Sequence, residues 1–400
     1  MKKVACLLLG LTVIVFLALL AGCADETEDE PTVEEIIKIG KKYLSNGDAV
    51  GAADAFNAAL KRDPNNADAK YGILLANTLQ FGNLISELLG MLEGFMAVDD
   101  GGDGDIETLS ESPAIGDLIQ DFFVQVLEPK FVQSNDLYYE LTFVPDLQFD
   151  LERYELVIAD MTLVDFSGVF GDAELHFFGT VNSLLLAVTN LLLAHDVNFD
   201  FDNLVIPEFG DDIMESIDAI VDLLRGLLSD PNYPNFLYLK EDGVFRMQAT
   251  GLNLGLTFLR LNFMIEAVKN DTGDQSDDPI RYIDENGNGL WDEDEAVEIS
   301  GLAVIEPELI PVISNLAGDL AVAIFDTTPL DIDPLDPNPF YPASLNDILI
   351  YLIDGLDTPI IPPGFLPIDL GPFFAAPSPD GLRNILELVV EIWDLVGGFF

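Results

Sequence analysis

The stretch DENGNGLWDEDE, residues 284–295, carries oxygen-bearing residues at the spacing that a calcium ion requires. A twelve-residue calcium loop needs oxygen ligands at positions 1, 3, 5, 7, 9 and 12, with glycine at position 6, where the chain turns too sharply for a Cβ atom. Counted from the first residue, the ligand positions hold Asp284, Asn286, Asn288, Leu290, Asp292 and Glu295. Gly289 stands at position 6, and Leu290 would bind through its backbone carbonyl. The sequence therefore predicts a calcium site, with calcium as its only cofactor.

The residues beside this loop limit what kind of calcium site it is. Pro279 precedes the loop by five residues and leaves no room for a long entering helix, and only a short helix fits before Gly301. The loop resembles the lone EF-hand-like loops of extracytoplasmic bacterial proteins. That resemblance implies a structural role, in which calcium orders residues 270–300 and Trp291 packs against the body. The alternative is an acidic turn whose Asn-Gly pairs only need positive φ.

The residues that could perform catalysis are few, and none forms a known catalytic motif. His176 and His195 are the only histidines; the first lies in a strand-like segment and the second ends an apolar helix, where histidine commonly caps carbonyls. The sequence has no serine-nucleophile elbow, zinc-protease motif or phosphate-binding glycine loop. In a chain with 71 acidic residues, a pair of carboxylates carries no information. We therefore predict no catalytic residues and no enzyme activity.

The N-terminus, MKKVACLLLGLTVIVFLALLAGC, joins a basic start, an apolar run and a small-residue pair before Cys23. This order resembles the signal peptide and lipobox of bacterial lipoproteins. The resemblance implies removal of residues 1–22 and acylation of Cys23, which would attach the protein to a lipid bilayer. Ala24, rather than Asp, after that cysteine favours the outer membrane over the inner one. An ordinary signal peptide or an uncleaved anchor is the alternative.

The charge and cysteine content restrict the partners of the chain. Seventeen basic against 71 acidic residues give a formal charge of −54, and loss of Lys2 and Lys3 makes it −56. Such a chain repels phosphate, so nucleic acid is excluded as a partner and a lipid anchor must supply any membrane affinity. Cations are natural partners, although adaptation to salt explains the acidity equally well. Cys6 and Cys23 are the only cysteines, so the mature chain has no disulfide.

Residues 32–98 form a first predicted module of helical hairpins. Apolar residues recur at helical spacing over Val33–Leu44 and Ala49–Arg62, and a third helix begins near Ala67. The pattern resembles a tetratricopeptide repeat, followed by a degenerate second one, and the positions that carry the resemblance are Gly40, Tyr43, Ala52, Phe56, Ala59 and Pro64. The resemblance implies that small residues let two helices approach around Phe56, and that the module binds a protein or peptide. A plain helical hairpin is the alternative.

The remaining chain is predicted to be mainly helical with a small β segment, an α+β fold. An acidic tether, 23–31, and a Gly/Asp linker, 99–111, flank the first module, and a larger helical domain covers 112–400. Two to four short strands are expected within Tyr138–Gly179. Helices are expected over 113–127, 180–196, 211–230, 247–268, 306–325, 344–356 and 382–396, with two Pro-rich loops between the last three.

These features together predict a membrane-anchored envelope lipoprotein that acts in protein–protein interaction or scaffolding and holds a structural calcium site. Two alternatives stay open. A periplasmic carrier of an apolar ligand is supported by the surplus of Leu, Phe and Ile and would need a large enclosed apolar cavity. An enzyme with an acidic cleft would need carboxylates and a histidine that converge.

Overall fold

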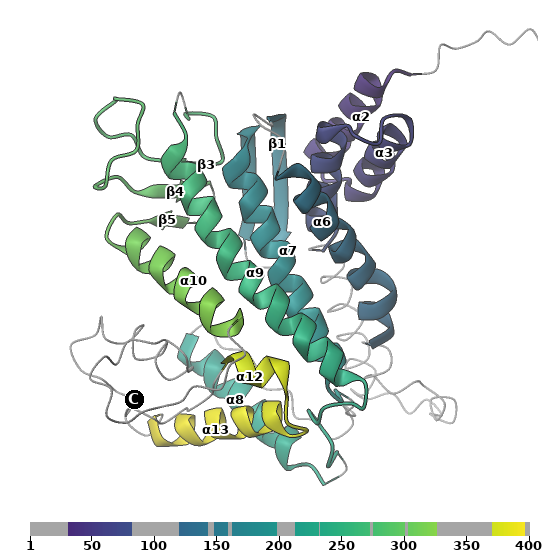
Figure 1. Cartoon of the computed structure of the whole chain (residues 1–400), viewed down its shortest axis with the longest axis vertical. Helices are drawn as coiled ribbons and strands as arrows, with labels where there is room; N and C mark the ends of the chain where they lie inside the picture. Colours follow the sequence, from purple (N-terminus) through teal and green to yellow (C-terminus); the bar gives the residue numbers. More distant parts are fainter. Residues whose placement is uncertain are drawn as a thin grey trace, which may run out of the picture.

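A computed structural model of the chain describes residues 31–81, 120–142, 148–158, 162–197, 213–231, 233–272, 275–300, 303–325 and 370–396 (Figure 1). The described part is mainly helical with two small antiparallel sheets, which confirms the predicted fold class. The predicted signal peptide and Cys23, the tether up to residue 30, the linker at 99–111 and the helix at 344–356 lie outside the described residues.

Two long helices, α7 (Asp172–Ala194) and α9 (Gly243–Asn270), pack along each other and form the centre of the molecule (Figure 1). Helix α6 (Glu128–Leu141) covers another side of α7, and α10 (Leu309–Phe325) lies along α9. Gly179 allows α6 and α7 to approach closely, because a Cβ atom there would lie 2.5 Å from the Tyr138 ring. These helices thus form a layer against which other elements pack.

Helix α7 has the composition of a membrane span but the packing of a core helix. Among the described residues, it is the one helix that is long and apolar enough to cross a membrane, and 56% of its most apolar window is buried. Its polar side chains are buried and bonded: Asn182 donates to the Phe131 carbonyl at 2.9 Å and Ser183 to the Gly179 carbonyl at 2.9 Å. This packing is that of a core helix.

The β-rich stretch forms one hairpin, β1 (Phe149–Ile158) and β2 (Thr162–Phe170), which lies in the middle of the predicted range. The ends of that range are helical, so the strand-like assignment of His176 was wrong. Helix α7 already begins at Asp172, because Glu174 accepts the N–H of Gly171 at 2.7 Å and caps the helix. Leu175 and Phe178, three residues apart, are then buried on one helical face.

The predicted end of a helix at Leu127 was also wrong. The chain passes through a π-helical turn, η1 (Phe123–Leu127), and continues as α6 to Leu141. The N–H of Glu128 bonds to the carbonyl of Phe123, five residues back. Pro129, which has no N–H to donate, follows this π-helical turn directly.

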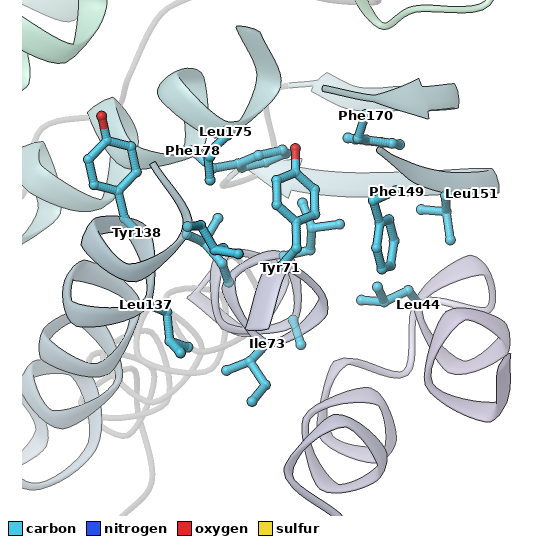
Figure 2. Packing of buried hydrophobic residues seen from close by; sticks show 14 of the residues in the cluster. Leu44, Tyr71, Ile73, Leu137, Tyr138, Phe149, Leu151, Phe170, Leu175 and Phe178 are labelled. Atoms are coloured by element: carbon cyan, nitrogen blue, oxygen red, sulfur yellow. The ribbon is translucent and has the colours of Figure 1, made fainter. Parts of the chain in front are cut away.

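The N-terminal helices α2 (Val33–Ser45) and α3 (Ala49–Arg62) match their predicted bounds to within one residue. Thr32 and Glu35 form a reciprocal cap at the start of α2, and Asp48 caps α3. This module shares one core with the β1–β2 hairpin: Leu44, Tyr71 and Phe149 lie together beside Phe170 (Figure 2). The Tyr71 and Phe149 rings are 5.4 Å apart, so the helical module packs on the body.

The C-terminal part adds a smaller cluster below the helical layer (Figure 1). Helices α8 (Ile213–Ser229) and α13 (Gly381–Val396) pack against each other, close to their predicted positions. Arg383 ties this cluster together by donating to the Phe236 carbonyl at 3.2 Å and to the Leu228 carbonyl at 2.5 Å. A short helix, α12 (Leu370–Ala375), lies where a Pro-rich loop was expected, because Phe374 is buried against α9.

Candidate calcium site

The predicted calcium loop closes a β-hairpin. Strands β3 (Ile280–Tyr282) and β4 (Val297–Ile299) pair antiparallel, with β5 (Ala303–Ile305) beside β4. Ile283 donates its N–H to the Ala296 carbonyl at 2.8 Å and closes the loop at its base. No long helix enters the loop, as expected, and the chain leaves it as strand β4, at a place where at most a short helix was expected to fit. The chain leaves as a strand because Val297 and Ile299 alternate toward the core.

The first half of the loop wraps backbone N–H groups around one carboxylate. Gly287 and Gly289 both have φ of +71°, a conformation that suits glycine. Asp284 accepts the N–H groups of Gly287 at 2.6 Å, Asn288 at 3.2 Å and Gly289 at 2.9 Å. The glycine at position 6 therefore serves the sharp turn for which the sequence pattern requires it.

Four of the predicted ligand side chains meet inside the loop. Asp292 Oδ2 accepts Asn286 Nδ2 at 2.6 Å and Asn288 Nδ2 at 2.8 Å, and Glu295 Oε1 accepts Asn286 Nδ2 at 3.3 Å. Leu290 lies on the same turn, with its side chain 52% exposed and its N–H donated to Asn288 Oδ1 at 2.6 Å. The loop brings these oxygen-bearing residues together with Asp284 on one turn of chain.

Glu295, the residue at position 12, is the buried member of the set. It is 1% exposed, and its carboxylate accepts the N–H of Glu285 at 3.2 Å and of Asp292 at 3.0 Å. These backbone donors hold the carboxylate at the base of the loop. A fixed carboxylate at this position is what a bidentate calcium ligand needs.

The donor set suits calcium, although the two amides face the wrong way for it. Carboxylate, amide and carbonyl oxygens are the ligands that calcium prefers. Within the described ranges, no three His, Cys, Asp or Glu side chains form a metal-holding group. The predicted set contains only Asp284, Asp292 and Glu295 of these types, and Asn286 and Asn288 now direct N–H₂ groups at Asp292. Calcium binding would require both amides to turn an oxygen inward.

The hairpin is fastened to the body by Trp291 and Tyr282. Trp291 packs against the main core, as expected, and Lys269 Nζ lies 5.2 Å from the centroid of its ring system. Tyr282 is 3% exposed, and burial raises the pKa of its hydroxyl, helped by the negative charge of Asp284 and neighbouring acids. Three of the four buried side-chain atoms without a partner in the described part lie here: Gln275 Nε2, Tyr282 Oη and Trp291 Nε1. The base of the loop is thus polar inside.

An acidic cleft of about 580 Å³ opens beside the hairpin, at the start of α7. Asp172, Asp271, Asp277 and Asp278 line it together with Glu174. Glu174 is 2% exposed and accepts the Ile280 N–H at 2.8 Å, so it joins α7 to β3. Burial raises the pKa of Glu174 to about 7, although three backbone N–H donors, those of Gly171, Glu174 and Ile280, oppose that rise.

Neither histidine lines this cleft or the groove between α6 and α9. His176 Nδ1 lies 2.8 Å from Tyr138 Oη, and burial, with the charge of Arg260, lowers its pKa to about 4. His195 Nδ1 lies 2.7 Å from the Leu191 carbonyl at the end of α7, and burial lowers its pKa. Both histidines have the environment of neutral core residues, so the geometry adds no support for catalysis.

The predicted repeat residues divide into a buried and an exposed group. Phe56, Ala52 and Ala59 are fully buried, and a Cβ at Gly40 would lie 2.7 Å from the Phe56 ring. Tyr43 is 38% exposed and Pro64 is exposed, so neither belongs to this contact. Sequence reasoning missed Gly72, where a Cβ would lie 2.4 Å from the same ring.

A buried arginine was also missed. Arg260, 1% exposed, donates to the Gly179 carbonyl at 3.0 Å and to Asn135 Oδ1 at 2.7 Å, and contacts Ser183 Oγ. The only sign in the sequence is a charged residue within the apolar spacing of α9. No protein-family model, curated protein or solved structure matches the chain.

Proposed function

We propose that this protein is a lipid-anchored envelope protein that acts in protein–protein interaction or scaffolding and uses residues 284–295 as a structural calcium site. The observation that supports the calcium site best is the buried Glu295 carboxylate at the base of a closed loop with two glycines at positive φ. The anchor and the envelope location rest on the N-terminal sequence up to Ala24.

Calcium would act as a staple for the hairpin. Asp284, Asp292 and Glu295 carry three negative charges within one loop, and a divalent cation would relieve their repulsion. Trp291 and Tyr282 both pack against the core, so a loop ordered by calcium would also stabilise the core. With a dissociation constant of about 10⁻⁴–10⁻³ M, 10 mM calcium would stabilise the fold by about 1.4–2.7 kcal/mol.

The calcium site is tested by titration of the mature chain. The sequence has two tryptophans, so a Trp393→Phe background leaves Trp291 as the only reporter. We expect calcium, added to 10 mM, to change Trp291 fluorescence and raise the Tm, while Glu295→Gln removes both responses. Glu241→Gln, an exposed residue outside the loop, is the matched control and should keep them. No response up to 10 mM calcium in the parent chain would refute the site.

The anchor is tested in cells. Metabolic labelling with a fatty acid should mark the full-length chain, and Cys23→Ser should abolish the label and release the protein from the membrane fraction. Retention of label or of membrane association in Cys23→Ser would contradict lipidation at that residue. This result is independent of the calcium titration, so the two parts of the proposal can fail separately.

A carrier of an apolar ligand is the second candidate function. It needs a cavity that encloses its ligand. The acidic cleft beside α7 and the more apolar groove between α6 and α9 are both open to solvent. Neither of these two openings, which are lined by described residues, encloses a ligand.

A further inference from the structure

A groove of about 650 Å³ lies between α6 and α9, and residues of α7 also line it. Its apolar lining is formed by Val132, Tyr139, Leu186, Phe245, Leu252 and Leu256. Phe245 is 79% exposed and Leu252 is 55% exposed, values far above those of core residues. Large apolar side chains that gather in one groove mark an interaction site more often than scattered ones do.

The apolar residues of α9 continue beyond the groove as a stripe. Phe245, Leu252, Leu256 and Phe263 are separated by 7, 4 and 7 residues, a spacing that places them on one helical face. At 1.5 Å per residue the stripe is about 27 Å long. Helix α9 also packs against α7 and α10, and Phe263 of the stripe contacts the His176 ring of α7, with the ring centroids 5.6 Å apart. Phe245 and Leu252 are the most exposed members of the stripe.

The charges around the groove are negative. Glu128 and Asp242 line it, and Asp136 lies exposed on the same face of α6 as Val132. Arg246, the one cation in the lining, is bonded to Glu128 and donates to Asn190 Oδ1 at 2.9 Å. With a formal charge of −54 on the chain, the field over the groove attracts cations and repels anionic lipid headgroups.

We propose that this groove docks a cationic amphipathic helix of about 18–20 residues from a partner protein, a length that matches the stripe. The apolar face of the helix would lie on Phe245 and Leu252, and its lysines or arginines would face Asp136 and Asp242, since Glu128 is already paired with Arg246. A hydrophobic groove is the kind of surface into which an amphipathic helix lays its apolar face. This inference rests on the proposed interaction function and names the class of partner.

The test uses three labelled 18-residue peptides and the mature chain without lipid. The first has leucine and lysine at amphipathic helical spacing, the second has the same composition in scrambled order, and the third has glutamate in place of lysine. We expect the first to bind at least 10-fold more tightly than the other two, measured by fluorescence anisotropy at 150 mM salt. Phe245→Asp and Leu252→Asp should each weaken that binding at least 10-fold. Val322→Asp, 67% exposed on α10, is the matched control and should leave it unchanged.

Four outcomes would overturn the proposal. Equal binding of the scrambled peptide would show only charge attraction, and insensitivity to Phe245→Asp and Leu252→Asp would place the peptide elsewhere. Binding of decanoate in place of the peptide would assign the groove to an apolar ligand, and dimerisation abolished by Leu252→Asp would assign it to a second copy. Circular dichroism establishes that both variants are folded. If the peptide fails while calcium still raises the Tm and Cys23 is acylated, only the docking proposal falls.

Discussion

The calcium-like loop and the polar layer around Arg260 are both dense in hydrogen bonds, but they are built over different distances along the chain. In the loop, the bonds of Glu295 reach residues at most 10 positions away. In the polar layer, Arg260 bonds to Gly179, Ser183 and Asn135, which are 77–125 positions away. The loop is therefore encoded locally, whereas the layer exists only when α6, α7 and α9 have packed.

This difference has an energetic consequence. Loop residues are mostly exposed and lose little when water replaces a partner, but Arg260 has no such replacement at 1% exposure. None of the described carboxylates forms an ion pair with Arg260, which instead lies 3.9 Å from the Tyr138 ring centroid and bonds to neutral oxygens. Burial accordingly lowers the pKa of Arg260, while the tyrosines oppose that shift. The layer should dominate stability, and the loop should matter chiefly when calcium is present.

Arg260→Ala should have the largest effect. It empties a fully buried side-chain volume and leaves acceptors on α6 and α7 without this donor, so we expect a loss of about 3–5 kcal/mol in the free energy of unfolding. Urea denaturation without calcium measures it. Arg281→Ala, which removes a half-exposed pair with Glu298, is the control and should cost at most about 1 kcal/mol. Equal losses in the two variants would contradict the comparison.

Glu174→Gln should change how stability depends on pH. The pKa of Glu174 is raised to about 7 by burial, from an ordinary 4.5, so the folded state holds its proton more tightly than the unfolded chain does. Its contribution is complete below pH 4.5 and is lost as pH rises through 7, by roughly 3 kcal/mol. We therefore expect the variant to gain stability relative to the parent between pH 5 and pH 8, measured by urea denaturation.

The control for this prediction separates Glu174 from other titrating groups. His176, with its pKa lowered to about 4, adds stability as pH rises through its window, which is the opposite sign, but it does so in both proteins. Glu241→Gln, at an exposed position, should follow the pH dependence of the parent. A parallel pH dependence for Glu174→Gln would show that burial does not raise the pKa of the Glu174 carboxyl in the folded protein.

The same local-to-distant contrast explains what could be predicted from the sequence. The bounds of α2 and α3 follow from Thr32, Asp48 and the spacing of apolar residues, all of which act within one turn. The turn at Gly289 follows from its own φ requirement. The misplaced His176 shows the limit, because aromatic residues favour strands in isolation and only the cap by Glu174 and the packing of Phe178 select a helix.

The rest of the site depends on contacts that no local pattern specifies. Nothing in the sequence around Glu295 indicates that its carboxylate is buried, and the inward orientation of the Asn286 amide depends on Asp292 across the loop. Gly72 and Arg260 were missed for the same reason, since the Phe56 ring and the α7 carbonyl that explain them come from other elements. The ligand residues and the turn of the loop were predictable from the sequence, but the contacts that attach the loop to the body were not.

Asn286→Asp tests whether the loop is poised for a cation. The change removes the hydrogen bond from the Asn286 amide to Asp292 and places a fourth carboxylate in the set. We therefore expect the free energy of unfolding of the calcium-free protein to fall by about 0.5–1 kcal/mol. Calcium should then raise the Tm more than in the parent, because added ligand charge strengthens a calcium site. Urea denaturation with and without 10 mM calcium measures both effects. A loss of stability that calcium does not restore would indicate an acidic turn held by amide hydrogen bonds instead of a calcium site.

Lys269→Gln should have the smallest effect on stability, and it tests the contact between the calcium-like loop and the body. Its ammonium lies 5.2 Å from the centroid of the Trp291 ring system and 2.9 Å from Glu266. Either the cation–π contact with Trp291 or the ion pair with Glu266, each worth about 0.5–1 kcal/mol, could account for the effect of Lys269. Glu266→Gln removes only the ion pair and is the matched control. If the Trp291 contact fastens the loop, Lys269→Gln alone should shift Trp291 fluorescence, and its cost should rise when calcium orders the hairpin. Equal costs for both variants, unchanged by calcium, would mean that the loop and the body are energetically independent.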